Sequence, residues 1–108
     1  MAELIKPSDL YQTLGTENSP VILDVRDRQE YKEGHLPEAL NIPLTELIQR
    51  LAEIPKDRLA VPYCNMRHRG NSRGEKAAEL LTENGFQAQA IDGGFIEWGS
   101  LGLPVKKD

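Results

Sequence analysis

Cys64, the single cysteine of this 108-residue chain, is the residue best suited to nucleophilic chemistry. It follows a short apolar segment, Leu59–Tyr63, and precedes a polar segment that leads into an amphipathic pattern. Residues 64–74 contain three arginines and no acidic side chain, although the whole chain has a formal net charge of -4. The thiol therefore lies in the most electropositive segment of an acidic protein.

This placement favours a reactive thiol over a structural one. The thiolate is the nucleophilic form of cysteine, and the pKa of a thiol falls beside cations or at a helix N-terminus. Ser72 and Glu75 have the spacing of a capping box, which predicts a helix that begins near the strand end carrying Cys64. A lone cysteine is more often a buried structural residue. The combination of strand, cysteine, basic segment and capped helix favours the nucleophile.

The other candidate functional residues follow Cys64. Arginine forms charge-assisted and bidentate contacts with sulfonate-like groups, so Arg69 or Arg73 could hold an anionic substrate. Arg67 and His68 could contact the substrate or face water; for Arg67 both interpretations stay open, and for His68 water is favoured. The candidate substrate-binding residues are Arg67, His68, Arg69, Gly70, Ser72 and Arg73.

Composition predicts one soluble globular domain spanning residues 1–108, with 39% hydrophobic and 28% charged residues. No apolar run approaches the roughly 20 residues of a membrane span, and the N-terminus lacks a secretory pattern. One cysteine excludes an internal disulfide, and no Cys/His spacing fits zinc, so we expect no metal, no cofactor and a cytoplasmic location. The acidic balance argues against a nucleic-acid partner.

Helical and strand patterns alternate along the chain. Together they predict an α/β fold with a mostly parallel sheet, in which ligands bind beyond the carboxyl ends of the strands. Cys64 lies at such an end. The predicted strands are Val21–Val25, a short segment at 39–43, Leu59–Tyr63 and Ala88–Ile91; the predicted helices begin at Ser8, near Arg26, at Thr45 and at Ser72.

Three residues in these segments have two interpretations each. Asp24 is either a local hydrogen-bonding anchor or part of a site, and the anchor is favoured. His35 lies in a turn beside a proline, where a structural role is favoured over acid–base chemistry. Pro62 has no N–H for a sheet ladder, so either pairing stops before it or the strand end is irregular.

Several segments, taken together and in order, resemble the rhodanese family over nearly the whole chain. The segments are Asp24–Arg26, Tyr31–Pro43, Tyr63–Cys64, Gly93–Trp98 and Gly102–Pro104. The resemblance implies a five-stranded, mostly parallel sheet flanked by helices on both faces, with a loop that cradles the cysteine. It also implies that Asp24, Arg26, His35 and Trp98 belong to the scaffold.

The resemblance further implies a sulfurtransferase of the thiosulfate type with Cys64 as its nucleophile. Sulfane sulfur would pass from a small anionic donor such as thiosulfate to a Cys64 persulfide. A thiophilic acceptor would then take it, either cyanide or a thiol, including the thiol of a protein such as thioredoxin. A persulfide carrier that serves a protein partner is an alternative within the same chemistry.

The chain departs from the family pattern in two places. Counting forward from Cys64 places the family arginine at Arg69, whereas counting back from Lys76 places it at Arg73, so the loop is about four residues longer than usual. Glu38 stands where a glycine is frequent. Cell-cycle-type phosphatases and some arsenate reductases resemble this fold with an enlarged loop, and such an enzyme is a further, less favoured alternative.

Overall fold

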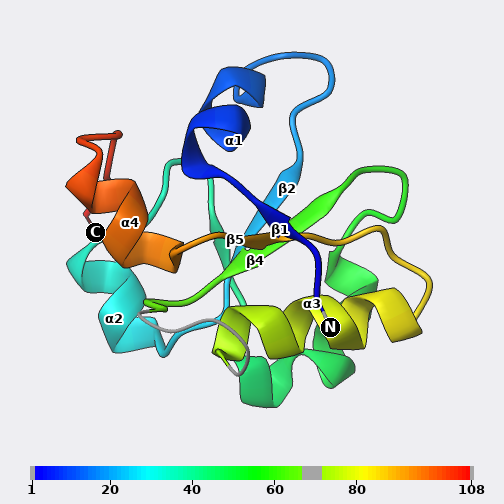
Figure 1. Cartoon of the computed structure of the whole chain (residues 1–108). Coiled ribbons are helices and arrows are strands. Elements are labelled where there is room, and N and C mark those ends of the chain that lie inside the picture. The colour runs from blue at the N-terminus through cyan, green and yellow to red at the C-terminus, as the bar shows by residue number, and fades with distance from the viewer. Residues whose placement is uncertain (1, 67–71, 108) are drawn as a thin grey trace.

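The computed structural model describes residues 2–66 and 72–107, which form a parallel sheet with helices on both faces (Figure 1). The strands are β1 (Leu4–Ile5), β2 (Val21–Asp24), β3 (Leu40–Asn41), β4 (Ala60–Tyr63) and β5 (Ala90–Ile91). The helices are α1 (Pro7–Thr13), α2 (Arg28–Glu33), α3 (Arg73–Glu83) and α4 (Gly94–Ser100), with 3-10 helices η1 (Leu44–Glu46) and η2 (Ile48–Glu53).

All strand pairs between these elements are parallel, as predicted. One ladder has the order β3-β2-β4, and a second ladder pairs β1 with β5. An isolated parallel bridge between Ala60 and Ala88 joins the two ladders. The five strands therefore follow one another as β1-β5-β4-β2-β3, although the short strand β1 was not predicted from the sequence.

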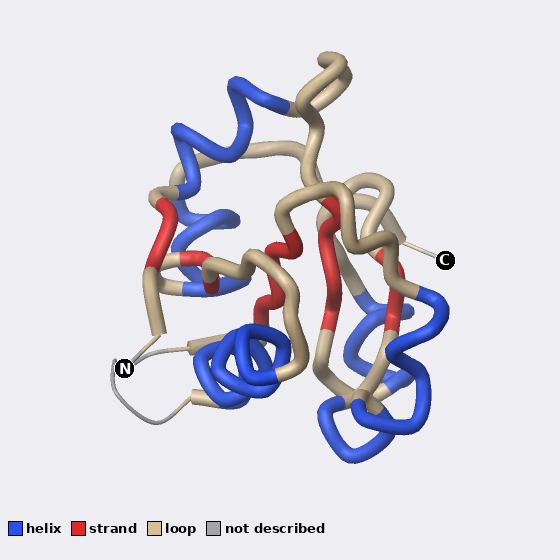
Figure 2. Tube along the Cα trace, turned by 90° about the vertical axis from the view of Figure 1, so that its right-hand side faces the viewer, coloured by secondary structure: helices blue, strands red, loops and turns tan. Residues whose placement is uncertain are grey.

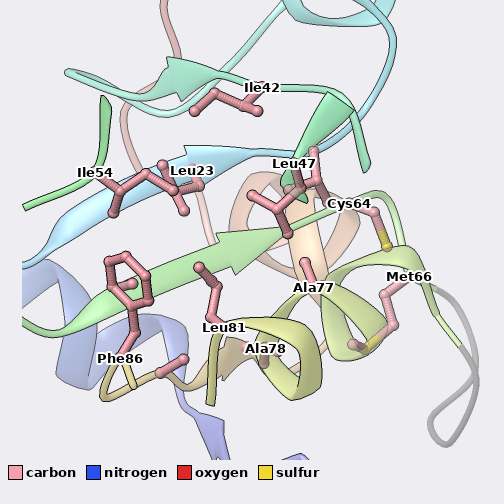
Figure 3. Close-up of a cluster of buried hydrophobic side chains, with 14 residues drawn as sticks. Leu23, Ile42, Leu47, Ile54, Cys64, Met66, Ala77, Ala78, Leu81 and Phe86 are labelled. Atoms are coloured by element: carbon pink, nitrogen blue, oxygen red, sulfur yellow. The ribbon is translucent and has the colours of Figure 1, made fainter. Parts of the chain in front are cut away.

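Alternation along the central strands divides the core into two clusters, one on each face of the sheet. Leu23 of β2 and Ala60 of β4 contribute to the cluster covered by α3, which Figure 3 shows. Ile22 and Val61, one position along in each strand, contribute to the cluster that includes Leu10 of α1 and Trp98 of α4. Since side chains of a strand alternate between faces, this pattern follows directly from the sequence.

Pro62 lies inside β4 and is paired with Leu23, so the first of the two alternatives, that pairing stops before Pro62, is wrong on the β2 side. The amide of Val25 donates to the carbonyl of Tyr63 at 3.0 Å, so odd-numbered residues of β4 present their polar groups to β2. The nitrogen of Pro62 faces the other neighbour. On that side the pairing consists of the isolated bridge at Ala60, and no ladder bond is lost at Pro62.

Two helix predictions need correction. Helix α1 begins at Pro7 with Lys6 as its N-cap, not at Ser8, because proline is well suited to the first helical position. The helix predicted from Thr45 is instead the pair η1 and η2, with a non-helical Arg50. A 3-10 helix has three residues per turn, so Leu44 and Leu47 lie on the same side and pack against the core. Ile48, the next residue, is 53% exposed.

The trace seen from the side shows the central strands between helices (Figure 2). Among residues 2–66 and 72–107, no helix has both the length and the apolar character that crossing a bilayer requires.

Glu38 has a backbone conformation that is unfavourable for residues other than glycine. The turn Leu36–Ala39 is closed by a 3.2 Å hydrogen bond from the Ala39 amide to the Leu36 carbonyl, with Pro37 second and Glu38 third. Glu38 has a φ of 64°, the left-handed value that a type II turn requires at its third position and that glycine adopts most readily.

We therefore expect Glu38→Gly to raise the free energy of unfolding by about 0.5–1 kcal/mol, because the relief of left-handed strain exceeds the entropic cost of a glycine. Urea unfolding of the two proteins measures this difference. Glu38→Ala is the matched control, since alanine keeps the strain and should bring no gain. Equal stability of the glycine and alanine variants would contradict the prediction.

Candidate active site

The candidate nucleophile, Cys64, directly follows β4 at the carboxyl end of the sheet. It is 3% exposed and belongs to the hydrophobic cluster on the α3 face, together with Met66 and Ala77. Figure 3 shows its sulfur at the end of the β4 arrow, beside the N-terminal part of α3. The sequence placed this cysteine correctly, at the strand end where ligands bind in sheets of this kind.

Two glycines allow helices to approach the backbone of Cys64 closely. A Cβ atom at Gly94 would lie 2.5 Å from the Cys64 carbonyl oxygen, and one at Gly74 would lie 3.2 Å from the Cys64 nitrogen. The first amides of α4 use this proximity: Phe95 N donates to the Cys64 carbonyl at 2.8 Å, and Ile96 N to the Asn65 carbonyl at 3.3 Å. These are amides that would lack a partner within the helix.

A buried ion pair lies beneath the site. Asp24 is fully buried and accepts hydrogen bonds from Arg26 (Nη2 to Oδ2, 2.7 Å) and from the Tyr63 hydroxyl (2.8 Å). Arg26 also donates to the carbonyl of Gly34 at 2.6 Å, and its guanidinium lies 4.4 Å from the ring centroid of Phe95. Asp24 is therefore an anchor of the scaffold, as favoured from the sequence.

Burial and the Asp24 carboxylate together determine the protonation of this network. Burial raises the pKa of the Tyr63 hydroxyl, and the negative charge of Asp24 adds to the effect, so Tyr63 stays neutral and donates. Burial alone would lower the pKa of Arg26, but its hydrogen bonds to Asp24 and the charge of that carboxylate outweigh burial and raise it. Arg26 thus remains charged although its side chain is almost fully buried.

A chain of polar contacts leads from this ion pair to the start of α3. Arg26 Nη1 donates to Asn65 Oδ1 at 3.1 Å, and Asn65 Nδ2 donates to Glu30 Oε2 at 2.9 Å. Glu30 also forms an ion pair with Arg73, the first residue of α3, with 3.1 Å between Arg73 Nη1 and Glu30 Oε1. This series of contacts, from Arg26 through Asn65 and Glu30 to Arg73, is called the polar chain below. It passes next to Cys64 in the sequence, because Asn65 directly follows the cysteine.

Pairing shifts the pKa of both Glu30 and Arg73. The hydrogen bonds from Arg73 lower the pKa of Glu30 despite its partial burial. The hydrogen bonds to Glu30 and the negative charge of that carboxylate in turn raise the pKa of Arg73. The Arg73 guanidinium is therefore bound to a carboxylate at the start of α3, the helix whose Gly74 lies against the backbone of Cys64.

The sequence-predicted binding residues fall into two groups. Ser72 caps α3: its hydroxyl accepts from the Glu75 amide at 3.1 Å, which confirms the predicted capping box. Arg73 is held by Glu30. The remaining candidates, Arg67, His68, Arg69 and Gly70, lie outside the residues that the structure describes.

Two residues of the site were missed from the sequence. Asn65 directly follows the cysteine, and Glu30 lies in a charged segment that indicated only a helical turn. The signal that could have found Glu30 is the Asp-x-x-Glu spacing of Asp27 and Glu30, which form the capping box of α2. That box fixes the carboxylate at the first turn of the helix facing Arg73.

The scaffold interpretation of His35 also agrees with the geometry. Its ring nitrogen Nδ1 lies 2.8 Å from the Tyr31 carbonyl, and its ring stacks on Tyr31 with 3.8 Å between centroids. Trp98 is fully buried and donates to the Pro104 carbonyl at 2.7 Å. Both residues hold chain segments together at a distance from the thiol's own contacts.

A cavity of about 190 Å³ opens beside the residue that follows Cys64. Glu30 and Asn65 line it on the side of the polar chain, and Phe95 of α4 lines it as well. The complete lining is Arg26, Glu30, Glu33, Gly34, Asn65 and Phe95. The cavity is small and four of its six lining residues are charged or polar, so it suits part of a substrate rather than a large cofactor.

Comparison with known proteins agrees with this geometry. The family model "Rhodanese-like domain" matches residues 6–101. A protein of Allochromatium vinosum named "Sulfurtransferase" is 33% identical over 106 residues, which cover 97% of this chain and 95% of that protein. A rhodanese-related protein from Thermoplasma volcanium, a solved structure, superposes with a TM-score of 0.85 at 28% identity, covering 98% of this chain and 99% of that one.

Another relative is much longer. An HTH-type transcriptional regulator of Mycobacterium tuberculosis is 40% identical over 84 residues, which cover 78% of this chain but 36% of the regulator. The chain therefore spans about a third of that relative and nearly all of the Allochromatium protein.

The contact at Gly94 yields a prediction. Gly94→Ala should lower the free energy of unfolding by about 2 kcal/mol or more, because the new methyl group would overlap the Cys64 and Asn65 carbonyls at a positive φ. Gly99→Ala is the matched control in the same helix, where a Cβ meets nothing within 4 Å. Thermal unfolding of both variants tests this, and equal effects would refute the proposed close approach.

The Glu30–Arg73 pair yields a second prediction. Because Arg73 lowers the pKa of Glu30 below the ordinary value of 4.5, the pair stabilises the fold above that pH and loses its contribution as pH falls through the lowered pKa. Glu30→Gln should therefore cost about 0.5–1 kcal/mol at neutral pH, and the difference from the wild type should disappear in acid. Urea unfolding across pH measures it; a pH-independent difference would contradict the assignment.

Proposed function

We propose, since this chain belongs to the rhodanese-like domain family, that it is a sulfurtransferase that carries sulfane sulfur as a persulfide on Cys64. The observation that carries the proposal is the position of Cys64 at the carboxyl end of β4, backed by Gly74 and Gly94 and flanked by the polar chain through Asn65. The Allochromatium relative of nearly equal length supports the same reaction class.

The proposed first step is a nucleophilic displacement at sulfur. The Cys64 thiolate attacks the outer sulfur of the donor; with thiosulfate, a new S–S bond forms on Cys64, the S–S bond of thiosulfate breaks, and sulfite leaves with the electron pair. Covalent catalysis of this kind divides one difficult transfer into two easier displacements. No external oxidant is needed, because the donor already carries sulfur in the transferable state.

The second step returns the enzyme to its starting form. The acceptor attacks the outer sulfur of the persulfide, the bond to the Cys64 sulfur breaks, and Cys64 leaves as a thiolate. Cyanide gives thiocyanate, and a thiolate gives a new persulfide. We propose a thiol as the acceptor class, including the thiol of a protein such as thioredoxin, and a carrier that serves a protein partner would use the same persulfide.

The polar chain suits the charge changes in both steps. Each displacement moves negative charge between Cys64 and the leaving group, and a fixed cation nearby stabilises it without reorganisation. Arg73 begins the helix whose Gly74 lies against the Cys64 backbone, and Glu30 holds the Arg73 guanidinium in place. We propose that Arg69, and Arg67, His68 and Gly70 with it, complete the donor site.

The proposal predicts a covalent intermediate. Incubation of the wild type with thiosulfate should add the mass of one sulfur atom, and later addition of cyanide should remove it. Cys64→Ser should gain no mass and should lose sulfur transfer entirely, because a hydroxyl is a poor nucleophile at its free pKa. Intact-mass spectrometry before and after cyanide measures both steps.

Thermal unfolding of Cys64→Ser is the control, and it should match the wild type within about 1 kcal/mol, since the thiol is small and makes no ion pair. Turnover near the wild-type rate in Cys64→Ser would refute the mechanism. Hydrolysis of an aryl phosphate without any sulfur adduct would instead identify a phosphatase on the same fold.

A further inference from the structure

Glu30 binds two residues that follow Cys64 in the sequence, Asn65 and Arg73. Its Oε2 accepts from Asn65 Nδ2 at 2.9 Å, one residue after Cys64, and its Oε1 accepts from Arg73 Nη1 at 3.1 Å, at the start of α3. A second contact, from Arg73 Nη2 to Glu30 Oε2 at 3.4 Å, makes the pairing bidentate. A single carboxylate therefore joins Asn65, Arg73 and α2.

The carboxylate is itself fixed. The amide of Asp27 donates to Glu30 Oε1 at 3.1 Å as part of the α2 capping box, so the side chain is held from its own helix as well. Its hydrogen bonds with Arg73, Asp27 and Asn65 all favour the ionised form. Glu30 therefore presents a negative charge to Asn65, the residue after Cys64, at neutral pH.

The pairing with Glu30 occupies the two Arg73 nitrogens that could otherwise bind an anionic substrate. A guanidinium that is bound on two nitrogens by a carboxylate must exchange that partner before it can bind a sulfonate in the same way. Both arginines of the polar chain are occupied in this manner, Arg26 by Asp24 and Arg73 by Glu30. A dianionic donor meets the carboxylate of Glu30 with twice the repulsion that a monoanion meets at the same distance.

We propose that Glu30 is a specificity-determining residue, which withholds Arg73 from small dianionic donors and so favours persulfide sulfur over thiosulfate as the substrate. This inference rests on the proposed function and names its donor class. Thiosulfate remains a donor, but a weak one. A persulfide donor reacts by the same displacement: Cys64 attacks the outer sulfur, the donor's S–S bond breaks, and the donor thiolate leaves.

The test compares two donors, thiosulfate and cysteine persulfide, in steady-state assays with cyanide as the acceptor. Glu30→Gln keeps the shape of the side chain and removes its charge, so Arg73 becomes available to thiosulfate. We expect KM for thiosulfate to fall about fivefold with little change in kcat. A change of this size corresponds to the free energy of one exposed ion pair. KM for cysteine persulfide should change less than about twofold, because its charge is smaller.

Glu53→Gln is the matched control. It removes the same charge from another partly exposed ion pair, in which Glu53 binds Arg50 at 2.9 Å, but Glu53 does not line the cavity. It should leave both KM values unchanged. In an Arg73→Gln background, Glu30→Gln should bring no gain, because the freed guanidinium is absent.

A binding measurement separates this inference from the proposed function. Calorimetric titration of thiosulfate into Cys64→Ser should show about fivefold tighter binding when Glu30→Gln is added, whether or not the wild type turns over. Unchanged affinity and unchanged KM for thiosulfate would overturn the role of Glu30 while leaving the sulfurtransferase proposal standing. A drop in kcat with both donors would also overturn it, by reducing Glu30 to a structural support. The absence of any sulfur adduct on wild-type Cys64 with either donor would overturn the proposed function instead.

Discussion

The buried ion pair between Asp24 and Arg26 is the constraint on which the rest of the site depends. A buried charge is costly unless every partner is in place, and breaking such a pair strands a charge in the core. Asp24 requires the Tyr63 hydroxyl, and Arg26 requires the Gly34 carbonyl and the Asn65 amide oxygen. The ion pair therefore fixes β2, the turn after α2 and the end of β4 relative to one another.

The position of Cys64 follows from that arrangement. Its two sequence neighbours, Tyr63 and Asn65, are both hydrogen-bonded to the same ion pair, one through Asp24 and the other through Arg26. Its own carbonyl is bound by the first amide after Gly94. The backbone on both sides of the thiol is thus held by the scaffold, which is the preorganisation that a covalent nucleophile requires.

How far the sequence predicts this molecule depends on whether a pattern is local. The capping box at Ser72 and the strand before Cys64 are local signals, and both were predicted correctly. The 3-10 geometry of residues 44–53 was not predicted, because the leucine spacing is compatible with an α-helix until the exposed Ile48 is seen. The capping-box spacing of Asp27 and Glu30 is a local signal for a helix start, but the site contacts of Glu30 are not local, because its partners are 35 and 43 residues away.

The two ion pairs of the site differ in what a change in them would cost. Asp24 and Arg26 are almost fully buried, so their replacement endangers the fold, whereas Glu30 and Arg73 are about one-third exposed and their pairing adds little to stability. A partly exposed pair of this kind can be altered without loss of the scaffold. Under the proposed function, donor preference is thus best tuned at Glu30 and Arg73, because Glu30 binds Asn65, the residue after Cys64, and neither Glu30 nor Arg73 belongs to the buried core.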